Sequence, residues 1–190
     1  MLEPWSAVVL AGGRAVGLGG VDKAGVEIGG RTLLAWVLDA VVDAREVVVV
    51  GDPVPTERPV TFARESPRYG GPAAGLLTGV DLLLDPAPYV AVVAVDMPRL
   101  RMATLRRLTE AAEGRDGAVL VGPDGRRQLA MVLATARLLE VRPGLEERHN
   151  LAMRRLLAPL DLVDVPAVGD EHRDVDSWED LRDLSSDPGT

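Results

Sequence analysis

Four continuous apolar runs constrain this chain more than any other feature. They occupy residues 6–10, 46–50, 89–95 and 117–121 and are rich in valine. A run that is apolar throughout, without alternating polar residues, is typical of a strand buried on both faces of a parallel sheet. Weaker runs at residues 60–63, 129–133 and 162–165 predict further strands. The chain is therefore expected to build a sheet that other elements cover on both sides.

Helical patterns between these runs supply the covering layers. The expected helices span residues 32–42, 72–84, 101–113, 151–157 and 178–184. Pro72 suits a first helical turn, and Ser177 with Asp180 forms a capping box before the last helix. Strands that alternate with helices indicate βαβ units. We therefore predict an α/β fold, with a Rossmann-like, mostly parallel sheet and helices on both faces.

No linker, internal repeat or low-complexity tract divides the 190 residues. We expect a single domain over residues 1–190, with a frayed polar tail at 185–190. The N-terminus has no basic leader, and the longest apolar runs are too short to span a bilayer. The expected location is the cytoplasm.

The net charge and the cysteine content limit which partners and which kinds of site are possible. The formal net charge is −8, which argues against nucleic acid or an anionic membrane as partner because phosphate polymers need a basic footprint. A free nucleotide needs only a local cluster of donors, so it stays compatible with this charge. The chain has no cysteine, which excludes disulfides, thiolate metal sites and a cysteine nucleophile.

A glycine-rich segment follows the first predicted strand. Residues 10–23 read LAGGRAVGLGGVDK, with five glycines. Glycine permits positive φ and close backbone approach, so successive N–H groups can point at phosphate oxygens. Lys23 adds a cation at the far end. The spacing fits neither GxGxxG nor GxxxxGK. The alternative is a flexible surface loop with an incidental lysine.

Three aspartates are candidate metal ligands. Asp96 comes just after the third strand, at the edge where ligands of open α/β sheets collect, and Mg²⁺ binds through one or two carboxylates plus substrate phosphates. Asp174 and Asp176 alternate, so an extended backbone places them on one side. The alternatives are an aspartate that caps the next segment and two solvated acids beside a helix cap. His149 and His172 lie outside these motifs, and we expect both at the surface without a catalytic role.

Four motifs occur in a fixed order along the chain: LAGG at 10–13 with the Asp22–Lys23 pair, GGPAAG at 70–75, DMP at 96–98 and DVDS at 174–177. This ordered set resembles the MobA-like nucleotidyltransferase family, whose best-known members are molybdenum cofactor guanylyltransferases. The resemblance covers residues 6 to about 184. It implies a sheet of the nucleotide-diphospho-sugar transferase type with an open nucleotide site over the strand C-termini. It also implies a reaction in which a substrate phosphate attacks the α-phosphorus of an NTP and releases pyrophosphate.

The resemblance also implies roles for particular residues. Lys23 would bind the phosphates, Asp96 would bind Mg²⁺, and the Asp174/Asp176 pair matches a family Asn-x-Asn or Asp-x-Asp pair in which Asp176 is the better metal candidate. Glu65 stands where the family commonly has an aspartate before its Gly-Pro segment. The implied substrate-binding residues are Leu10, Ala11, Gly12, Gly13, Lys23, Glu65, Gly71 and Gly75.

Two positions depart from the family pattern. Gly17 stands where the family has a loop arginine that contacts the phosphates, and Arg14, three positions earlier, is the candidate to replace it. Residues 128–130 read QLA where guanylyl-transferring members commonly carry His-Pro. Losing one preorganised charge contact typically costs about 3–4 kcal/mol in the transition state. The missing loop arginine is therefore expected to lower the turnover rate. The QLA sequence indicates that the acceptor side of the site differs from that of the guanylyl-transferring members.

We expect a Mg²⁺-dependent nucleotidyltransferase whose substrates are an NTP, with GTP expected, and a molybdopterin-type phosphate. Its expected state is a monomer or weak homo-oligomer. The alternatives are a degenerate relative that binds nucleotide or a partner without turnover, and a related enzyme that uses CTP or a sugar phosphate. A nucleotide-sugar glycosyltransferase is a further alternative, but the 96–98 motif lacks the second acid of an Asp-x-Asp pair.

Overall fold

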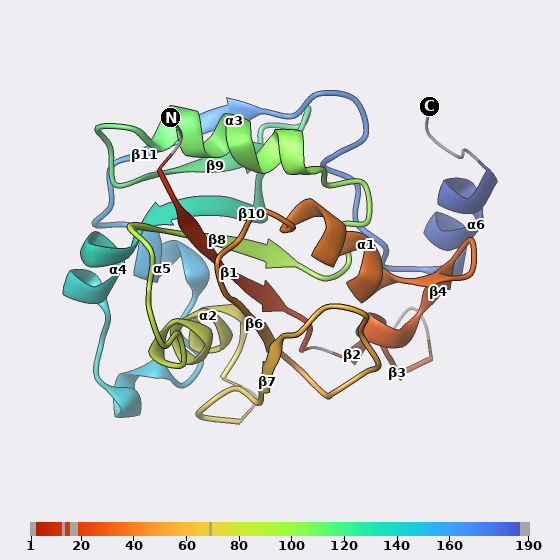
Figure 1. The fold of residues 1–190 in the computed structure, drawn as a ribbon, viewed down its shortest axis with the longest axis horizontal. Coiled ribbons are helices and arrows are strands. Elements are labelled where there is room, and N and C mark those ends of the chain that lie inside the picture. The colour runs from red at the N-terminus through yellow and green to blue at the C-terminus, as the bar shows by residue number, and fades with distance from the viewer. Residues whose placement is uncertain (1–2, 13, 16–18, 69, 187–190) are drawn as a thin grey trace.

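The fold is built on one seven-stranded sheet (Figure 1). The computed structural model describes residues 3–12, 14–15, 19–68 and 70–186. The strand order is β11-β9-β10-β8-β1-β6-β7. In chain order these strands are β1 (Trp5–Leu10), β6 (Val47–Val50), β7 (Thr61–Ala63), β8 (Tyr89–Ala94), β9 (Gly117–Val121), β10 (Arg127–Ala134) and β11 (Leu162–Pro166). Only β10 runs antiparallel to its neighbours within this sheet, so the mostly parallel arrangement is confirmed.

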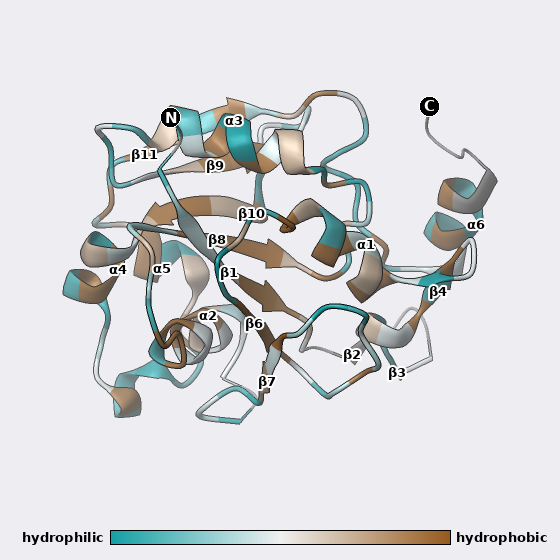
Figure 2. Ribbon diagram, in the orientation of Figure 1, coloured by the Kyte–Doolittle hydropathy of each residue, from teal (hydrophilic) through white to brown (hydrophobic). Residues whose placement is uncertain are grey.

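Helices pack on both faces of the sheet, as the continuous apolar strands require. One face is covered by α1 (Leu33–Ala40) and α3 (Met102–Ala112), the other by α2 (Pro72–Asp81), α4 (Thr135–Val141) and α5 (Met153–Leu157). Helix α6 (Trp178–Ser186) lies beyond the end of the sheet in Figure 1 and adds Leu181 and Leu184 to the core on the α1 and α3 side. In β1, Ala7 and Val9 belong to the core on the α1 and α3 side of the sheet, and Val8 belongs to the core on the α2, α4 and α5 side. All three side chains are fully buried. Figure 2 shows the central strands as the most hydrophobic part of the ribbon. This confirms the predicted α/β class.

The capping box before α6 is also confirmed. The Ser177 N–H donates to Asp180 Oδ2 at 2.8 Å, and the Asp180 N–H donates to Ser177 Oγ at 3.2 Å. Helix α6 extends through Ser186, two residues beyond the predicted end of this helix. A helix that has already started adds residues at little cost, so two polar residues need not end it.

Several small elements were not predicted. Helix α4 follows β10 directly, and its N-cap Ala134 offers no side-chain hydrogen bond, so the sequence carries no start signal. Two hairpins of two-residue strands were also missed: β2 (Arg14–Ala15) with β3 (Val21–Asp22), and β4 (Glu27–Ile28) with β5 (Arg31–Thr32). Such short strands give no periodic pattern that could reveal them. The 3₁₀ turns η2 (Lys23–Gly25) and η3 (Leu145–Arg148) complete the described elements.

Within the described ranges, no helix is both long enough and apolar enough to cross a bilayer.

Candidate active site

The loops that carry the predicted site residues all leave the same edge of the sheet. Strands β1, β8 and β11 run in the same direction, so their carboxyl ends meet there. The glycine-rich segment follows β1 and Asp96 follows β8. The segment of residues 167–177 after β11, called the strap below, carries Asp174 and Asp176. Lys23 and Asp176, which are 153 positions apart in sequence, therefore meet at this edge of the sheet.

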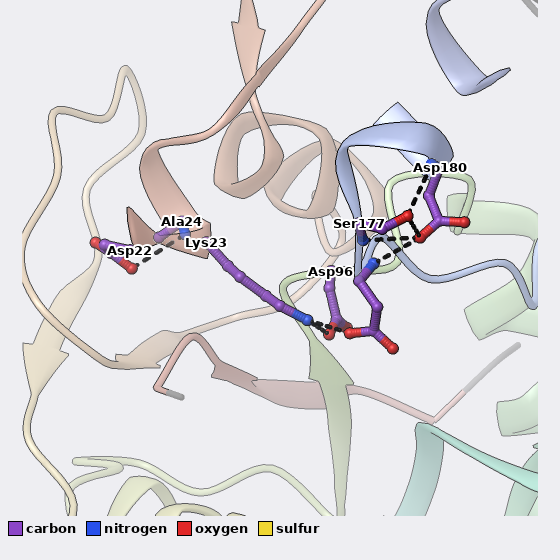
Figure 3. A network of polar contacts seen from close by, with 7 residues as sticks. Asp22, Lys23, Ala24, Asp96, Ser177 and Asp180 are labelled. Atoms are coloured by element: carbon purple, nitrogen blue, oxygen red, sulfur yellow. Dashed lines mark hydrogen bonds and ion pairs between the residues drawn. The ribbon is translucent and has the colours of Figure 1, made fainter. Parts of the chain in front are cut away.

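Lys23 is the centre of this arrangement. Its Nζ donates to Asp96 Oδ2 at 2.8 Å and to Asp176 Oδ1 at 2.6 Å, and Figure 3 shows its side chain extended toward Asp96. The lysine side chain is only 14% exposed. Its backbone is fixed by η2, where Asp22 Oδ1 accepts from the Ala24 N–H at 3.1 Å and Ala24 is fully buried. Lys23 is also the only lysine in the sequence.

The strap is pinned beside Asp96 through its backbone. The Val175 N–H donates to the Asp96 carbonyl oxygen at 2.8 Å, and the Val175 side chain is fully buried. The two aspartates that flank this valine are exposed. The sequence alternation thus serves a physical purpose, since a buried valine directs its two acidic neighbours away from the core.

The electrostatics show a cluster with surplus negative charge. Burial alone would lower the pKa of Lys23, but the hydrogen bonds that its ammonium donates to Asp176 and Asp96, together with the negative charge of these carboxylates, outweigh burial and raise the pKa above 10.5. Desolvation raises the pKa of Asp174, and repulsion by the Asp176 and Asp96 carboxylates raises it further. Two carboxylates thus pair with one ammonium, and a third lies close enough to be repelled by them, an arrangement that favours a further cation.

The residues fit a magnesium ion that substrate oxygens help to bind. The Lys23 ammonium shows that the Asp96 and Asp176 carboxylates converge on one cation-sized position. Among the described residues, no group of three or more histidine, aspartate or glutamate side chains has the geometry of a metal site. A pair of carboxylates is what Mg²⁺ uses when phosphates and water complete its shell.

Residues 10–12, which the resemblance implies hold the base and ribose side of the nucleotide, offer backbone more than side chains. Leu10 and Ala11 are buried, and the Ala11 N–H is already bonded to the Val50 carbonyl oxygen at 2.8 Å. Ala11 packs so closely on Gly51 that a Cβ at position 51 would lie 2.8 Å from the Ala11 Cβ. Gly12 is exposed. Any contact from this stretch is therefore made by the exposed main chain at its end.

Three predicted loop positions cannot be placed in this geometry. Gly13 and Gly17 lie outside the described residues, and so does the side chain of Arg14, although its backbone begins β2. The roles predicted for these residues stay predictions.

The GGPAAG motif forms the start of α2. Gly71 is its N-cap, with a φ of 89° that only glycine adopts without strain, and Pro72 occupies the first turn. Gly75 is buried against β1, where an added Cβ would meet Leu10 Cδ2 at 3.2 Å. Glu65 is half-buried in the loop before this helix. Gly75 therefore packs a helix on a strand, whereas Gly71 lies at an open turn.

One residue that supports the site was missed from the sequence. Glu171, in the strap, is buried and accepts from Thr104 Oγ1 at 2.6 Å, from the Val168 N–H at 2.8 Å and from the Arg107 guanidinium. These bonds tie the strap to α3. Thr104 and Glu171 are 67 positions apart, so no local pattern announces their contact.

Glu171→Ala is expected to lower the free energy of unfolding by about 1.5–3 kcal/mol, the range for hydrogen bonds to a charged group. Loosening the strap should also weaken Mg²⁺-dependent nucleotide binding, because Asp174 and Asp176 follow it directly. Chemical denaturation and calorimetry measure the two effects. Glu179→Ala, at an exposed position on α6, is the control. Equal effects of the two substitutions on stability would contradict the anchoring role.

The raised pKa of Lys23 predicts a defined pH dependence. Because the folded-state pKa exceeds the unfolded value, this group contributes stability that is fully present below about pH 10.5 and is lost as the pH rises through the folded pKa. A protein labelled with ¹³C-lysine gives one lysine side-chain signal, which reports the titration directly. The signal should titrate above the ordinary value, and Asp96→Asn should shift it downward. Titration of the wild type at or below 10.5 would contradict the ion-pair geometry.

Comparison with known proteins agrees with the ordered motifs. The family model described as the MobA-like NTP transferase domain matches residues 7–165. A "Probable molybdenum cofactor guanylyltransferase" from Natronomonas pharaonis is 30% identical over 168 residues, covering 84% of this chain and 81% of the relative. A protein with the same name from Methanosarcina acetivorans is 31% identical over 175 residues, covering 83% and 76%.

A solved structure supports the fold independently. The molybdopterin-guanine dinucleotide biosynthesis protein A from Archaeoglobus fulgidus superposes with a TM-score of 0.74 at 19% identity, covering 95% of this chain and 97% of that one. The sheet is thus of the nucleotide-diphospho-sugar transferase type, as the resemblance implied. With a family model that spans most of the sheet and relatives at about 30% identity over most of their length, the chain belongs to the MobA-like NTP transferase family, a family of nucleotidyltransferases.

Proposed function

We propose that this protein is a Mg²⁺-dependent nucleotidyltransferase that transfers GMP from GTP to the phosphate of a molybdopterin-type acceptor and releases pyrophosphate. The observation that carries the proposal is the convergence of Lys23, Asp96 and Asp176 at the carboxyl edge of the sheet, at 2.6 and 2.8 Å. The names of the relatives supply the acceptor and the base.

The chemistry needs little beyond positioning and charge. An oxygen of the acceptor phosphate forms a bond to the α-phosphorus, the α–β bridging P–O bond breaks, and its electron pair leaves with pyrophosphate. Phosphoryl-type transfer of this kind needs charge neutralisation and alignment more than a covalent catalyst. A bound Mg²⁺ supplies part of that neutralisation, and Asp96 and Asp176 are the residues that would hold it.

Lys23 has two successive partners in this proposal. Without substrate, its ammonium neutralises Asp96 and Asp176. With substrate, it turns to the phosphate oxygens of the donor, where it offsets charge that moves to the leaving pyrophosphate. The exposed main chain at Gly12 and the open turn at Gly71 border the space for base and ribose.

Pyrophosphate release tests the proposal. The protein is mixed with each NTP, with and without Mg²⁺ and with a molybdopterin preparation, and the product is analysed for the best donor. Release that needs GTP, Mg²⁺ and the acceptor together is expected. Tight nucleotide binding without release would instead support the degenerate binder that Gly17 suggests, and preference for CTP would indicate a cytidylyltransferase. The single domain, the monomeric or weakly oligomeric state and the cytoplasmic location stay predictions.

A further inference from the structure

The Asp176 carboxylate is held in place although it lies at the surface. Its side chain is 69% exposed, yet its Oδ1 accepts from Lys23 Nζ at 2.6 Å, beside Asp96. A metal site needs its ligands held to within about 0.5 Å. An exposed aspartate that moves freely with a loop does not meet that need. The backbone around Asp176 therefore has to supply the restraint.

Three consecutive backbone N–H groups are bonded at this point. The Val175 N–H donates to the Asp96 carbonyl oxygen at 2.8 Å. The next two, those of Asp176 and Ser177, both donate to Asp180 Oδ2, at 3.1 and 2.8 Å. Figure 3 shows the Asp180 side chain directed toward Ser177. The backbone is thus fixed on both sides of the Asp176 side chain, by the segment that carries Asp96 and by Asp180.

Asp180 makes one bond more than a helix cap requires. In a capping box, the third helical residue accepts from the N–H of the capping residue, which here is Ser177. The Asp176 N–H lies outside α6, so its bond to Asp180 adds nothing to the hydrogen bonding of the helix. The same Oδ2 atom also accepts from Ser177 Oγ at 2.7 Å. The geometry thus directs the Asp180 carboxylate to the backbone of residues 176 and 177.

Helix α6 gives Asp180 a fixed base. Leu181 and Leu184 are buried in the core on the α1 and α3 side of the sheet. Near the end of the helix, Arg99 Nη2 donates to the Leu184 carbonyl oxygen at 3.0 Å, where a cation also complements the helix dipole. Arg99 lies three residues after Asp96. The helix that carries Asp180 is therefore joined to the segment that carries Asp96.

We propose that Asp180 is a positioning residue for Asp176, and that α6 is the element through which the chain sets the distance between the Asp96 and Asp176 carboxylates. The inference rests on the proposed function, which makes these two carboxylates the metal ligands, and deepens it. Asp180 touches neither metal nor substrate in this role, because it acts on the backbone from which the Asp176 carboxylate reaches the cation. Asp176 and α6 both lie beyond residue 165, where the match to the family model ends.

Amide hydrogen exchange tests the positioning without metal or nucleotide. In the full chain, Asp180→Ala should raise the exchange rate of the Asp176 amide by about 10-fold, which corresponds to one ordinary hydrogen bond. Ser177→Ala is the matched control, because it removes the Oγ that caps α6 but leaves the Asp176 N–H bonded to Asp180. It should speed exchange of the Leu181 amide, which donates to the Ser177 carbonyl oxygen, without exposing the Asp176 amide.

Mn²⁺ binding then measures what the positioning does for the site. With GTP present, Asp180→Ala should weaken Mn²⁺ binding roughly 10- to 100-fold, the usual loss when the partner of a metal ligand is removed. Asp180→Asn should recover most of the affinity, because an amide oxygen can still accept from the backbone. Glu179→Gln, at the exposed position before Asp180, controls for the general loss of negative charge. Thermal unfolding shows that each variant is folded.

A double-mutant cycle separates positioning from direct binding. If Asp180 acts through Asp176, Asp180→Ala should have no further effect on Mn²⁺ affinity in a protein that already carries Asp176→Asn. Additive losses would show that Asp180 contacts the cation or acts through its charge, and would overturn the inference. Unchanged Mn²⁺ affinity in Asp180→Ala, or equal losses in Asp180→Ala and Ser177→Ala, would overturn it as well.

Turnover distinguishes the positioning role from the proposed function. If the wild type transfers GMP while Asp180→Ala keeps its Mn²⁺ affinity and its slow Asp176 amide exchange, the positioning role is wrong and the proposed function stands. If both readouts change as expected but the wild type gives no transfer with any NTP, the proposed function fails and the role of Asp180 stands.

Discussion

Asp96→Asn is expected to remove the joint stabilisation that Mg²⁺ and GTP give the wild-type protein. A ligand at about 100 times its dissociation constant stabilises a protein by about 2.7 kcal/mol, which thermal unfolding detects easily. Asparagine keeps the shape of Asp96 but lacks the charge that a divalent cation requires. Turnover should fall by about two to three orders of magnitude, the usual result of losing one preorganised charge contact.

The fold itself should tolerate this change. Without ligands, Lys23 keeps Asp176 as its partner at 2.6 Å, so the melting temperature in metal-free buffer should move little. Asp39→Asn is the matched control, because Asp39 is exposed and forms an ion pair of its own with Arg31 at 2.8 Å. If the Asp96→Asn variant kept its Mg²⁺-dependent stabilisation by GTP, Asp174 or Asp176 would have to be the primary ligand.

The sequence predicted the architecture well where a pattern extends over several residues. Strands β1, β6, β8 and β9 were visible as continuous apolar runs, because a strand buried on both faces is apolar throughout. Helix α1 was visible because a helix buried on one face has apolar residues at helical spacing. Their alternation then placed the motifs at one edge of the sheet. Elements without such a sequence pattern were missed. Helix α4 lacks a capping side chain, and the two-residue strands are shorter than any period.

The contacts of the site could be predicted only in part. Order along the chain indicated that Lys23, Asp96 and Asp176 belong to one site, but not that the ammonium bonds both carboxylates across 73 and 153 positions. Such pairing depends on loop conformation, which no local pattern encodes. The same holds for the Glu171 anchor on α3.

Lys23→Met should change two binding constants in opposite directions. Methionine keeps much of the length of the side chain but has no charge, so affinity for GTP with Mg²⁺ should fall by about 1.5–3 kcal/mol, the range for a charged hydrogen bond. Binding of a divalent cation without nucleotide should instead become tighter. In the wild type an incoming cation competes with the ammonium for Asp96 and Asp176, whereas the variant leaves these carboxylates without a counter-ion.

Mn²⁺ binding followed by electron paramagnetic resonance, together with calorimetry of GTP binding, measures both constants on the same preparation. Lys23→Arg is the control for charge, because it keeps a permanent cation but replaces the compact ammonium by a planar fork. It should keep Mn²⁺ affinity close to that of the wild type. A general loss of structure would weaken both ligands together, so opposite signs are specific to the exchange of partners. If Lys23→Met weakened Mn²⁺ and GTP alike, the ammonium would be a fixed part of the carboxylate cluster and would not be the group that turns to the phosphates.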